Sequence, residues 1–214
     1  MTSSLTLNTM TSPDNHLFTK EYYEDGIRQH ISGYENYKWM PTRSIPEALD
    51  IQDNFEFETC VDYGCAKGFL VNALRIIGCD AYGEDISEYA IENCPENVRD
   101  YISLPNEKVY DLLICKDMLE HVKVEDLPEV LGKIRVKSNK FFFVIPLGDR
   151  DRFRIREYEV DITHVTKKDE EWWINLFESQ GFKLDKFSYS LGSVKEKWTE
   201  TYPYGNGFFI LSTK

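Results

Sequence analysis

The sequence predicts an α/β fold, in which strands and helices alternate along the chain around a mostly parallel sheet. Short apolar or β-branched runs alternate with stretches whose apolar residues recur at helical spacing. A turn of small residues at 64–68 joins one such strand directly to a helix. The 214 residues suit one domain, and 42% hydrophobic residues are enough to fill its core.

The chain is organised around residues 58–77, ETCVDYGCAKGFLVNALRII. Residues 59–61 predict a buried strand that ends at Asp62, and the apolar spacing over 69–77 predicts a helix. The turn between them consists of Gly64, Cys65, Ala66, Lys67 and Gly68. A strand, a tight small-residue turn and a helix in this order are typical of nucleotide-binding α/β folds.

The positions of the glycines narrow the choice of cofactor. A dinucleotide fingerprint would place glycines at positions 64, 66 and 69, but this chain has Gly64, Ala66 and Phe69. The bulk of Phe69 is incompatible with the helix-packing role of a third glycine. The chain also lacks the P-loop pattern of a nucleoside triphosphatase.

The pattern that fits is Asp62 followed by G-x-A-x-G, which resembles motif I of the class I S-adenosylmethionine (SAM)-dependent methyltransferases. One departure is Ala66, which replaces the middle glycine of the usual pattern with another small residue. The resemblance implies a Rossmann-like, seven-stranded, mostly parallel sheet with helices on both faces and an antiparallel last strand. It also implies SAM as the cofactor and S-adenosylhomocysteine as the product.

Two later segments extend the resemblance. In YGEDISEYAI, the family pattern aligns Asp85 with the carboxylate that accepts hydrogen bonds from the ribose hydroxyls, with Glu84 as the alternative. Residues 110–122, YDLLICKDMLEHV, resemble the fourth strand and the loop under the methionine part of SAM. The predicted cofactor-binding residues are Asp62, Tyr63, Gly64, Cys65, Ala66, Gly68, Glu84, Asp85, Ile86 and Lys116. The alternative is a plain α/β domain with an accidental glycine turn.

Composition limits the partners. A net charge of −12 and a pI near 4.8 disfavour nucleic-acid substrates and anionic membranes. Five scattered cysteines without CxxC pairs indicate reduced core residues of a cytoplasmic protein. No signal-peptide pattern or long apolar run is present, and no His/Asp set has a convincing ligand spacing, so the sequence predicts no metal site. Oligomeric state is left open.

We divide the chain into a disordered tail (1–16), a helical lid or extension (17–56) and a SAM-binding domain (57–214). In the resembling family such an extension often covers the cofactor and lines the substrate site. The residues predicted to do so here are Tyr34, Tyr37 and Trp39. The alternative is that these aromatic side chains pack a helix onto the sheet. A helix is predicted over 44–51, with Ser44 as its cap and Pro46 in its first turn.

The remaining elements follow from periodicity and capping residues. The expected strands are 80–83, a poorly marked third strand within 98–104, 111–115, 140–145, 187–191 and 207–211. The expected helices begin after the cap Ser87, cover 127–134, and run from Thr166 to a C-terminal Gly181.

Methyl transfer to a hydroxyl needs a group that takes the hydroxyl proton, and histidine has a suitable pKa. His164 lies in a segment that resembles the D-x-T-H segment of sugar and small-metabolite methyltransferases, with Asp161 as its orienting partner. His121, in the triplet LEH, and Asp117 are the other candidate bases. The alternative for both histidines is a hydrogen bond that braces a loop.

A cluster of arginines, Arg150, Arg152 and Arg154, is predicted to bind the phosphates of a nucleotide-linked sugar, unless neighbouring acidic residues neutralise it. We therefore expect a methyltransferase acting on a hydroxyl of a small polar metabolite, first a sugar, nucleotide sugar or glycan. The alternatives are a small-amine or protein methyltransferase and a SAM-binding regulatory protein without catalysis.

Overall fold

The computed structural model describes residues 15–214. The predicted tail therefore lies almost wholly outside the described residues, and its last part forms the short 3-10 helix η1 (Asn15–Leu17). Within the described part of the chain, no helix is both long and apolar enough to span a bilayer.

Seven strands form one sheet in the order β3-β2-β1-β4-β5-β9-β8. They are β1 (Thr59–Tyr63), β2 (Asp80–Glu84), β3 (Ile102–Ser103), β4 (Leu112–Lys116), β5 (Lys140–Pro146), β8 (Phe182–Ser188) and β9 (Asn206–Thr213). The pairs among β1 to β5 are parallel, and β9 is antiparallel to both β5 and β8. The predicted fold class is confirmed, including the antiparallel last strand.

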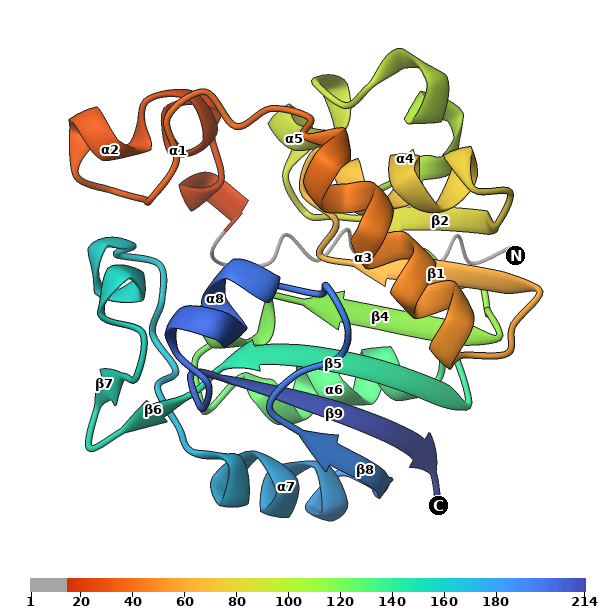
Figure 1. The fold of residues 1–214 in the computed structure, drawn as a ribbon, viewed down its shortest axis with the longest axis vertical. Coiled ribbons are helices and arrows are strands. Elements are labelled where there is room, and N and C mark those ends of the chain that lie inside the picture. Colours follow the sequence, from red (N-terminus) through yellow and green to blue (C-terminus); the bar gives the residue numbers. More distant parts are fainter. Residues whose placement is uncertain (1–14) are drawn as a thin grey trace, which may run out of the picture.

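Helices cover both faces of this sheet (Figure 1). The longer ones are α3 (Pro41–Asn54) and α4 (Phe69–Ile76) on one face, and α6 (Leu127–Arg135) and α7 (Glu170–Ser179) on the other. The shorter ones are α1 (Lys20–Glu24), α2 (Gly26–Gln29), α5 (Glu88–Glu92), α8 (Glu196–Thr201), η2 (Glu96–Tyr101), η3 (Leu119–His121) and η4 (Arg156–Val160). A small hairpin pairs β6 (Gly148–Asp149) with β7 (Arg152–Phe153).

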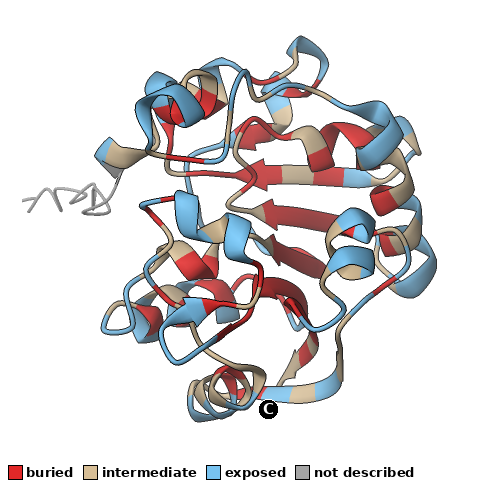
Figure 2. Cartoon of the chain, turned by 60° about the vertical axis from the view of Figure 1, so that its left-hand side comes forward, coloured by how far each residue is buried: buried red, intermediate tan, exposed pale blue. Residues whose placement is uncertain are grey.

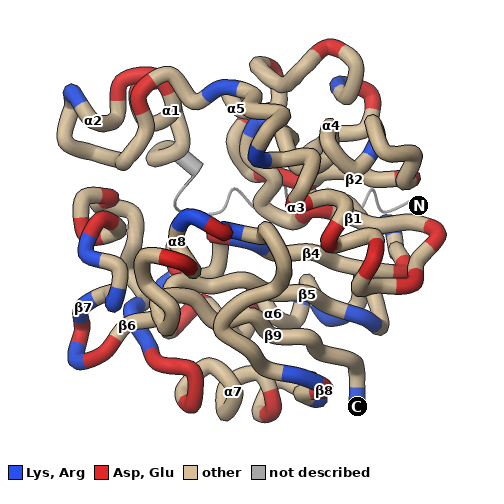
Figure 3. Tube along the Cα trace, viewed as in Figure 1, with Lys and Arg blue, Asp and Glu red and all other residues tan. Residues whose placement is uncertain are grey.

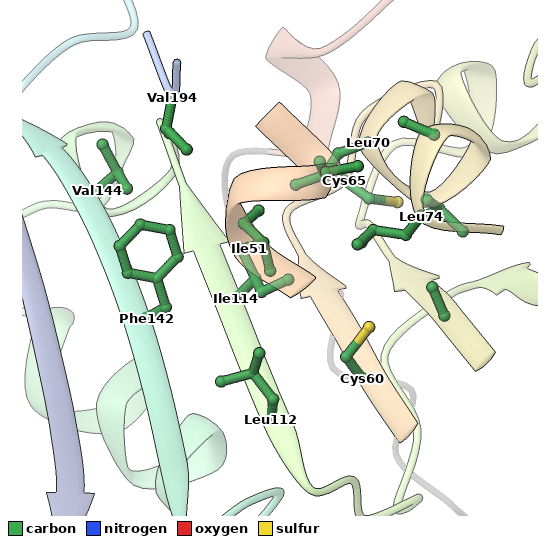
Figure 4. Close-up of a cluster of buried hydrophobic side chains, with 14 of the residues drawn as sticks. Ile51, Cys60, Cys65, Leu70, Leu74, Leu112, Ile114, Phe142, Val144 and Val194 are labelled. Atoms are coloured by element: carbon green, nitrogen blue, oxygen red, sulfur yellow. The ribbon is translucent and has the colours of Figure 1, made fainter. Parts of the chain in front are cut away.

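The sheet has a hydrophobic core on each face because its central strands are apolar on both sides. Along β5, Phe142 packs on the α3–α4 side, whereas Phe141 and Phe143 pack on the α6–α7 side, and all three are fully buried. Each such side chain contributes roughly 1.5–3 kcal/mol of transfer free energy. Figure 2 shows the buried central strands, and Figure 4 shows Ile51 of α3 and Leu74 of α4 meeting the strand side chains.

Two helix starts differ from the sequence prediction. Helix α3 begins at Pro41 rather than at Ser44, because a proline at the first helical position needs no N–H acceptor; Pro46 lies inside the helix. Helix α7 begins at Glu170 with Asp169 as its cap, whose carboxylate accepts a hydrogen bond from the Trp172 N–H at 2.8 Å. Thr166 instead donates its hydroxyl to the Val122 carbonyl at 2.6 Å.

The sixth strand of the chain also lies earlier than predicted. Strand β8 ends at Ser188, whereas the prediction was 187–191. A register irregularity between Leu184 and Lys186 breaks the alternation of side chains, so a search for a period of two finds only the end of the strand. The other strands lie where they were expected, with ends that move by a few residues.

The N-terminal segment 18–39 crosses the carboxyl ends of the parallel strands, where α1 and α2 appear on the left in Figure 1. Its tyrosines Tyr22 and Tyr23 are buried and pack with Ala66 of the glycine turn and Ala90 of α5.

A surface cavity of about 970 Å³ lies at the amino ends of β1, β2 and β4, and none of the predicted site residues lines it.

Candidate cofactor and acceptor site

The turn after β1 has the backbone shape of a ligand-binding loop. Gly64, Ala66 and Gly68 have φ angles of 83°, 49° and 68°. A Cβ on Gly64 would lie 2.4 Å from the Met118 side chain, and one on Gly68 would lie 2.0 Å from Ile102. Glycine is therefore required at both positions by conformation and by space, while Ala66 accepts a strained conformation in between.

Asp85 connects this turn to the end of β2. One carboxylate oxygen accepts a hydrogen bond from the Ala66 N–H at 2.7 Å, and the other accepts one from the Ser87 N–H at 2.8 Å. Burial raises the pKa of Asp85, although these N–H donors act in the opposite direction. Each oxygen keeps lone-pair capacity for a ribose hydroxyl, so the geometry fits the predicted role.

Glu84, the alternative ribose ligand, is engaged elsewhere. Its carboxylate accepts a hydrogen bond from Lys137 Nζ at 2.8 Å, and the residue is 1% exposed. Its backbone carbonyl accepts hydrogen bonds from the N–H groups of Gly64 and Cys65 at 2.8 and 3.1 Å. Glu84 thus supports the turn through its backbone, and the choice between the two acidic residues favours Asp85.

Asp62 and Lys116 stand at the ends of the adjacent strands β1 and β4. Burial raises the pKa of Asp62 to about 7, against the opposing influence of the Lys116 charge. Lys116 Nζ lies 3.4 Å from Asp117 and 3.8 Å from Glu47 of α3. A buried carboxyl beside a cation at this edge suits the amino-acid part of SAM, whose ammonium and carboxylate need opposite charges.

Asp117 is held as an anion by two lysines. Burial raises the pKa of Asp117, but Lys195 and Lys116 more than offset this effect, so the pKa lies well below its usual value. Lys195 Nζ contacts the Asp117 carboxylate and also donates to Asn206 Oδ1 at 2.7 Å. A carboxylate in this state is a weak proton acceptor, which argues against Asp117 as the general base.

His121 and His164 lie side by side, with ring centroids 4.6 Å apart. His121 Nδ1 is 2.7 Å from Thr163 Oγ1, and Thr163 donates its hydroxyl to Asp161 at 2.6 Å. His164 Nδ1 is 2.8 Å from the Tyr158 carbonyl, so this nitrogen carries the proton when the ring is neutral. Burial and the nearby His164 charge lower the pKa of His121 to about 4.

The predicted orienting role of Asp161 is therefore corrected. The distance from Asp161 Oδ2 to His164 Nε2 is 3.9 Å, which is too long for a hydrogen bond. Asp161 instead accepts the Tyr22 hydroxyl at 2.8 Å and positions His121 through Thr163. It thus joins the N-terminal segment to the loop that carries both histidines.

The predicted substrate-binding aromatic residues divide into two groups. The rings of Tyr34 and Tyr37 are 4.6 Å apart, and both phenols lie within the electrostatic influence of Arg43 and Asp117. Burial raises the pKa of Tyr37 to about 12. Trp39 packs instead against the core on the α3–α4 side, where its ring lies 6.0 Å from Phe69. Trp39 thus fits the packing alternative, whereas the substrate-binding role of Tyr34 and Tyr37 stays a prediction.

The three arginines share the β6–β7 hairpin and its flank but have different environments. Charges of both signs alternate along this hairpin in Figure 3. Arg154 donates to Asp149 at 2.7 and 2.9 Å and to Glu170 at 2.7 Å, so the interpretation of Arg154 as a free phosphate ligand is corrected. Arg150, at the turn with a φ of 50°, and Arg152 are exposed.

Sequence reasoning did not identify three buried ionisable residues near this site. Lys67 ion-pairs with Glu24 and donates to the Tyr37 carbonyl at 3.2 Å, which fastens the N-terminal segment to the glycine turn. Lys195 holds Asp117, and Glu120 is buried beside the histidines. The LEH triplet could have pointed to Glu120. No local pattern indicates Lys195, which lies far along the chain, just before α8.

The sheet order, the turn after β1 and the acidic residue after β2 together define the fold of the class I SAM-dependent methyltransferases. A family model described as a methyltransferase domain matches residues 32–186. The chain belongs to this family. The methyltransferase class and SAM as its cofactor, both predicted from the sequence, are thereby confirmed.

Two curated relatives are similar over part of the chain. The ribosomal protein L11 methyltransferase of Fusobacterium nucleatum is 26% identical over 148 residues, which are 62% of this chain and 47% of the relative. The ubiquinone biosynthesis O-methyltransferase of Methylococcus capsulatus is 35% identical over 75 residues, which are 29% of this chain and 32% of the relative. The chain thus matches less than half the length of these relatives.

Solved structures share the fold at low identity. The mitomycin 7-O-methyltransferase superposes with a TM-score of 0.60 and 16% identity, over 80% of this chain and 54% of the other. Magnesium protoporphyrin IX methyltransferase from Synechocystis, with S-adenosylhomocysteine bound, has a TM-score of 0.58 and 14% identity, over 81% and 84% of the two chains. These likenesses concern the fold alone.

Proposed function

We propose that this protein transfers the methyl group of SAM to a hydroxyl of a small polar metabolite. The observation that carries the proposal is the half-buried pair of His121, just past β4, and His164, which lie side by side near the predicted cofactor loop. Two imidazoles with their Nδ1 atoms engaged leave two Nε2 atoms as proton acceptors. An amine or a thiolate acceptor has less need of such a group.

SAM supplies the methyl group: its S–CH₃ bond breaks as the new O–CH₃ bond forms, and S-adenosylhomocysteine remains. The proton of the acceptor hydroxyl goes to Nε2 of His164, because the lowered pKa of His121 makes that ring the weaker proton acceptor. Asp85 binds the ribose, and the backbone of Gly64 to Gly68 lies against the cofactor. The N-terminal segment shields the site from water. It is held to the histidine loop by the Tyr22–Asp161 hydrogen bond and to the glycine turn by Lys67.

A sugar or nucleotide sugar is the first acceptor class to test. Tyr34 and Tyr37 form an aromatic pair near Asp117 that would contact a sugar ring, and the Asp117 carboxylate can accept hydrogen bonds from its hydroxyls. Arg43 and Lys116 supply positive charge at this end of the sheet. The exposed Arg150 and Arg152 remain candidate contacts to the outer part of a larger acceptor.

The test is release of S-adenosylhomocysteine from SAM with a panel of free sugars, nucleotide sugars, small diols, small amines and a ribosomal protein. We expect turnover with a hydroxyl acceptor and a loss of roughly 100-fold or more in kcat when both His121 and His164 are replaced by Ala. His16→Ala and His30→Ala, at exposed positions, are the matched controls. Methylation of amines or protein alone would contradict the hydroxyl assignment.

A further inference from the structure

The side chains of Glu120, His121 and His164 form a cluster whose potential ligand atoms all lie within 4.8 Å of one another. Three ligands bound at about 2.1 Å to a common ion lie roughly 3.0–3.4 Å apart, so shifts of about an ångström or less per side chain suffice to close the cluster on an ion. Among residues 15–214, these three form a group of His, Cys, Asp or Glu side chains close enough together to bind one metal ion.

The two imidazoles are oriented as metal ligands are. The Nδ1–H of His164 donates to the Tyr158 carbonyl at 2.8 Å. Thr163 Oγ1 uses its hydrogen on Asp161, so it accepts from the Nδ1–H of His121 at 2.7 Å. Both Nε2 atoms therefore keep a lone pair. A histidine ligand almost always donates its other N–H to a carbonyl, a carboxylate or a comparable group, which fixes its tautomer and its direction.

The environment of Glu120 points to a bound ion independently of the histidine geometry. The residue is 1% exposed, and neither of its carboxylate oxygens has a hydrogen-bond partner. A buried carboxylate without any partner is costly, and such a group is retained where it binds something. The backbone of Glu120 is rigidly placed, because its carbonyl accepts hydrogen bonds from the Val165 and Thr166 N–H groups at 2.9 and 3.0 Å.

We propose that Glu120, His121 and His164 bind one divalent transition-metal ion at the acceptor side of the site. Two imidazole nitrogens and one carboxylate oxygen suit manganese, iron, cobalt or zinc better than magnesium, which prefers oxygen ligands. Three protein ligands leave further coordination positions open to an acceptor oxygen and water. Asp117 lies near, but Lys195 holds its carboxylate, so it is not part of the ligand set in this structure. The sequence prediction of no metal site missed the cluster because His164 lies more than forty residues beyond the adjacent Glu120 and His121.

An ion at this position would lower the pKa of a hydroxyl bound to it. In the metal-loaded chain the imidazole lone pairs are occupied by the ion, so the hydroxyl proton would leave to water in place of the transfer to an imidazole that applies to the metal-free chain. This use of the ion rests on the proposed function, whereas the binding of the ion does not. Metal binding and methyl transfer can therefore be measured separately.

The experiment is calorimetric titration of the chelator-treated full chain with Mn²⁺, with the electron paramagnetic resonance signal of the bound ion as a second readout. We expect one ion per chain and a loss of about 100-fold or more in affinity for Glu120→Gln and for His164→Ala. His16→Ala, which removes an exposed imidazole, should leave the affinity unchanged. Circular dichroism identifies any variant that fails to fold, and Glu120→Gln is nearly isosteric.

Absence of binding to the folded wild type at millimolar Mn²⁺, repeated with Zn²⁺ and Co²⁺, would overturn the proposal. Binding that survives both ligand substitutions would overturn it as well, because the ion would then lie elsewhere. If the ion binds but no acceptor is methylated, the metal site stands and the proposed function fails. If methylation continues at full rate in excess chelator while S-adenosylhomocysteine still binds, the proposed use of the ion fails.

Discussion

The carboxylate of Asp85 accepts a hydrogen bond from the backbone N–H of Ala66 at 2.7 Å, which ties the end of β2 to the turn after β1. The same carboxylate accepts the Ser87 N–H at 2.8 Å, at the cap of α5. Three elements that are separate in sequence therefore share one anionic group. Its remaining lone pairs lie where the ribose of the cofactor is expected.

Replacing Asp85 by Asn tests this relationship. The amide has one oxygen, so it cannot accept from both the Ala66 and the Ser87 N–H groups, and one buried donor loses its partner. We expect the affinity for S-adenosylhomocysteine to fall about tenfold or more, and stability to fall by about 1–3 kcal/mol. Calorimetry and urea unfolding measure the two effects. Asp100→Asn, at an exposed position, is the control and should change neither.

Replacing Lys67 by Met should loosen the N-terminal segment. The Lys67 side chain is 8% exposed, and its loss leaves Glu24 without its cation and the Tyr37 carbonyl without its donor. We expect a loss of about 1–3 kcal/mol in urea unfolding and faster proteolysis within residues 18–39. Lys133→Met removes the exposed pair with Glu129 and should cost less than about 0.5 kcal/mol. Equal effects of the two substitutions would contradict the anchoring role of Lys67.

Asp62 predicts a pH dependence of stability. Its folded-state pKa of about 7 lies above the unfolded value of 3.8, so the native state binds the proton more tightly. The stability that this difference provides is complete below the unfolded pKa and is lost as the pH rises through the folded pKa. Relative to wild type, Asp62→Asn should therefore gain about 2 kcal/mol between pH 5.5 and pH 8.

Thermal or urea unfolding across this pH range measures the Asp62 effect, with Asp53→Asn as the exposed control. A stability difference between Asp62→Asn and wild type that does not change with pH would mean that Asp62 is ionised at low pH in the folded chain. The Lys116 charge would then dominate over burial.

Thr163 should act on the proposed metal site through His121. Thr163→Val keeps the shape of the side chain but removes the acceptor of the His121 Nδ1–H. We expect Mn²⁺ affinity to fall about tenfold, less than for removal of a ligand itself. Thr42→Val, at an exposed position, is the control. An unchanged affinity in Thr163→Val would show that the His121 ring is positioned by packing, for example against Phe18, whose ring centroid lies 5.4 Å away.

The sequence predicted the sheet well because each central strand is a short, continuous apolar run that can be recognised without knowledge of its neighbours. The run 141–146 is apolar throughout and is buried on both faces, as expected for a central strand. The glycine turn was equally clear, because positive φ angles at Gly64 and Gly68 demand glycine. The first residues of β8 were missed because a register irregularity near Asp185 interrupts the alternation of buried and exposed side chains.

The acceptor side was predicted less completely because its contacts join distant parts of the chain. His121 and His164 were selected one by one, but their adjacency depends on a loop that Thr166 and Glu120 hold in place. Arg154 is engaged by Asp149, one of the neighbouring acidic residues of the sequence alternative, and by Glu170 of α7, which no local pattern indicates. Lys195 carries no motif at all, and only the tertiary fold brings it to Asp117.

The most direct measurement of the central claim is calorimetric titration of the wild-type chain with S-adenosylhomocysteine. We predict one site per chain with a micromolar dissociation constant, about 8 kcal/mol of binding free energy, and clear weakening in Asp85→Asn. No heat of binding up to millimolar ligand with a folded chain, or tight binding of a nicotinamide dinucleotide instead, would contradict the account.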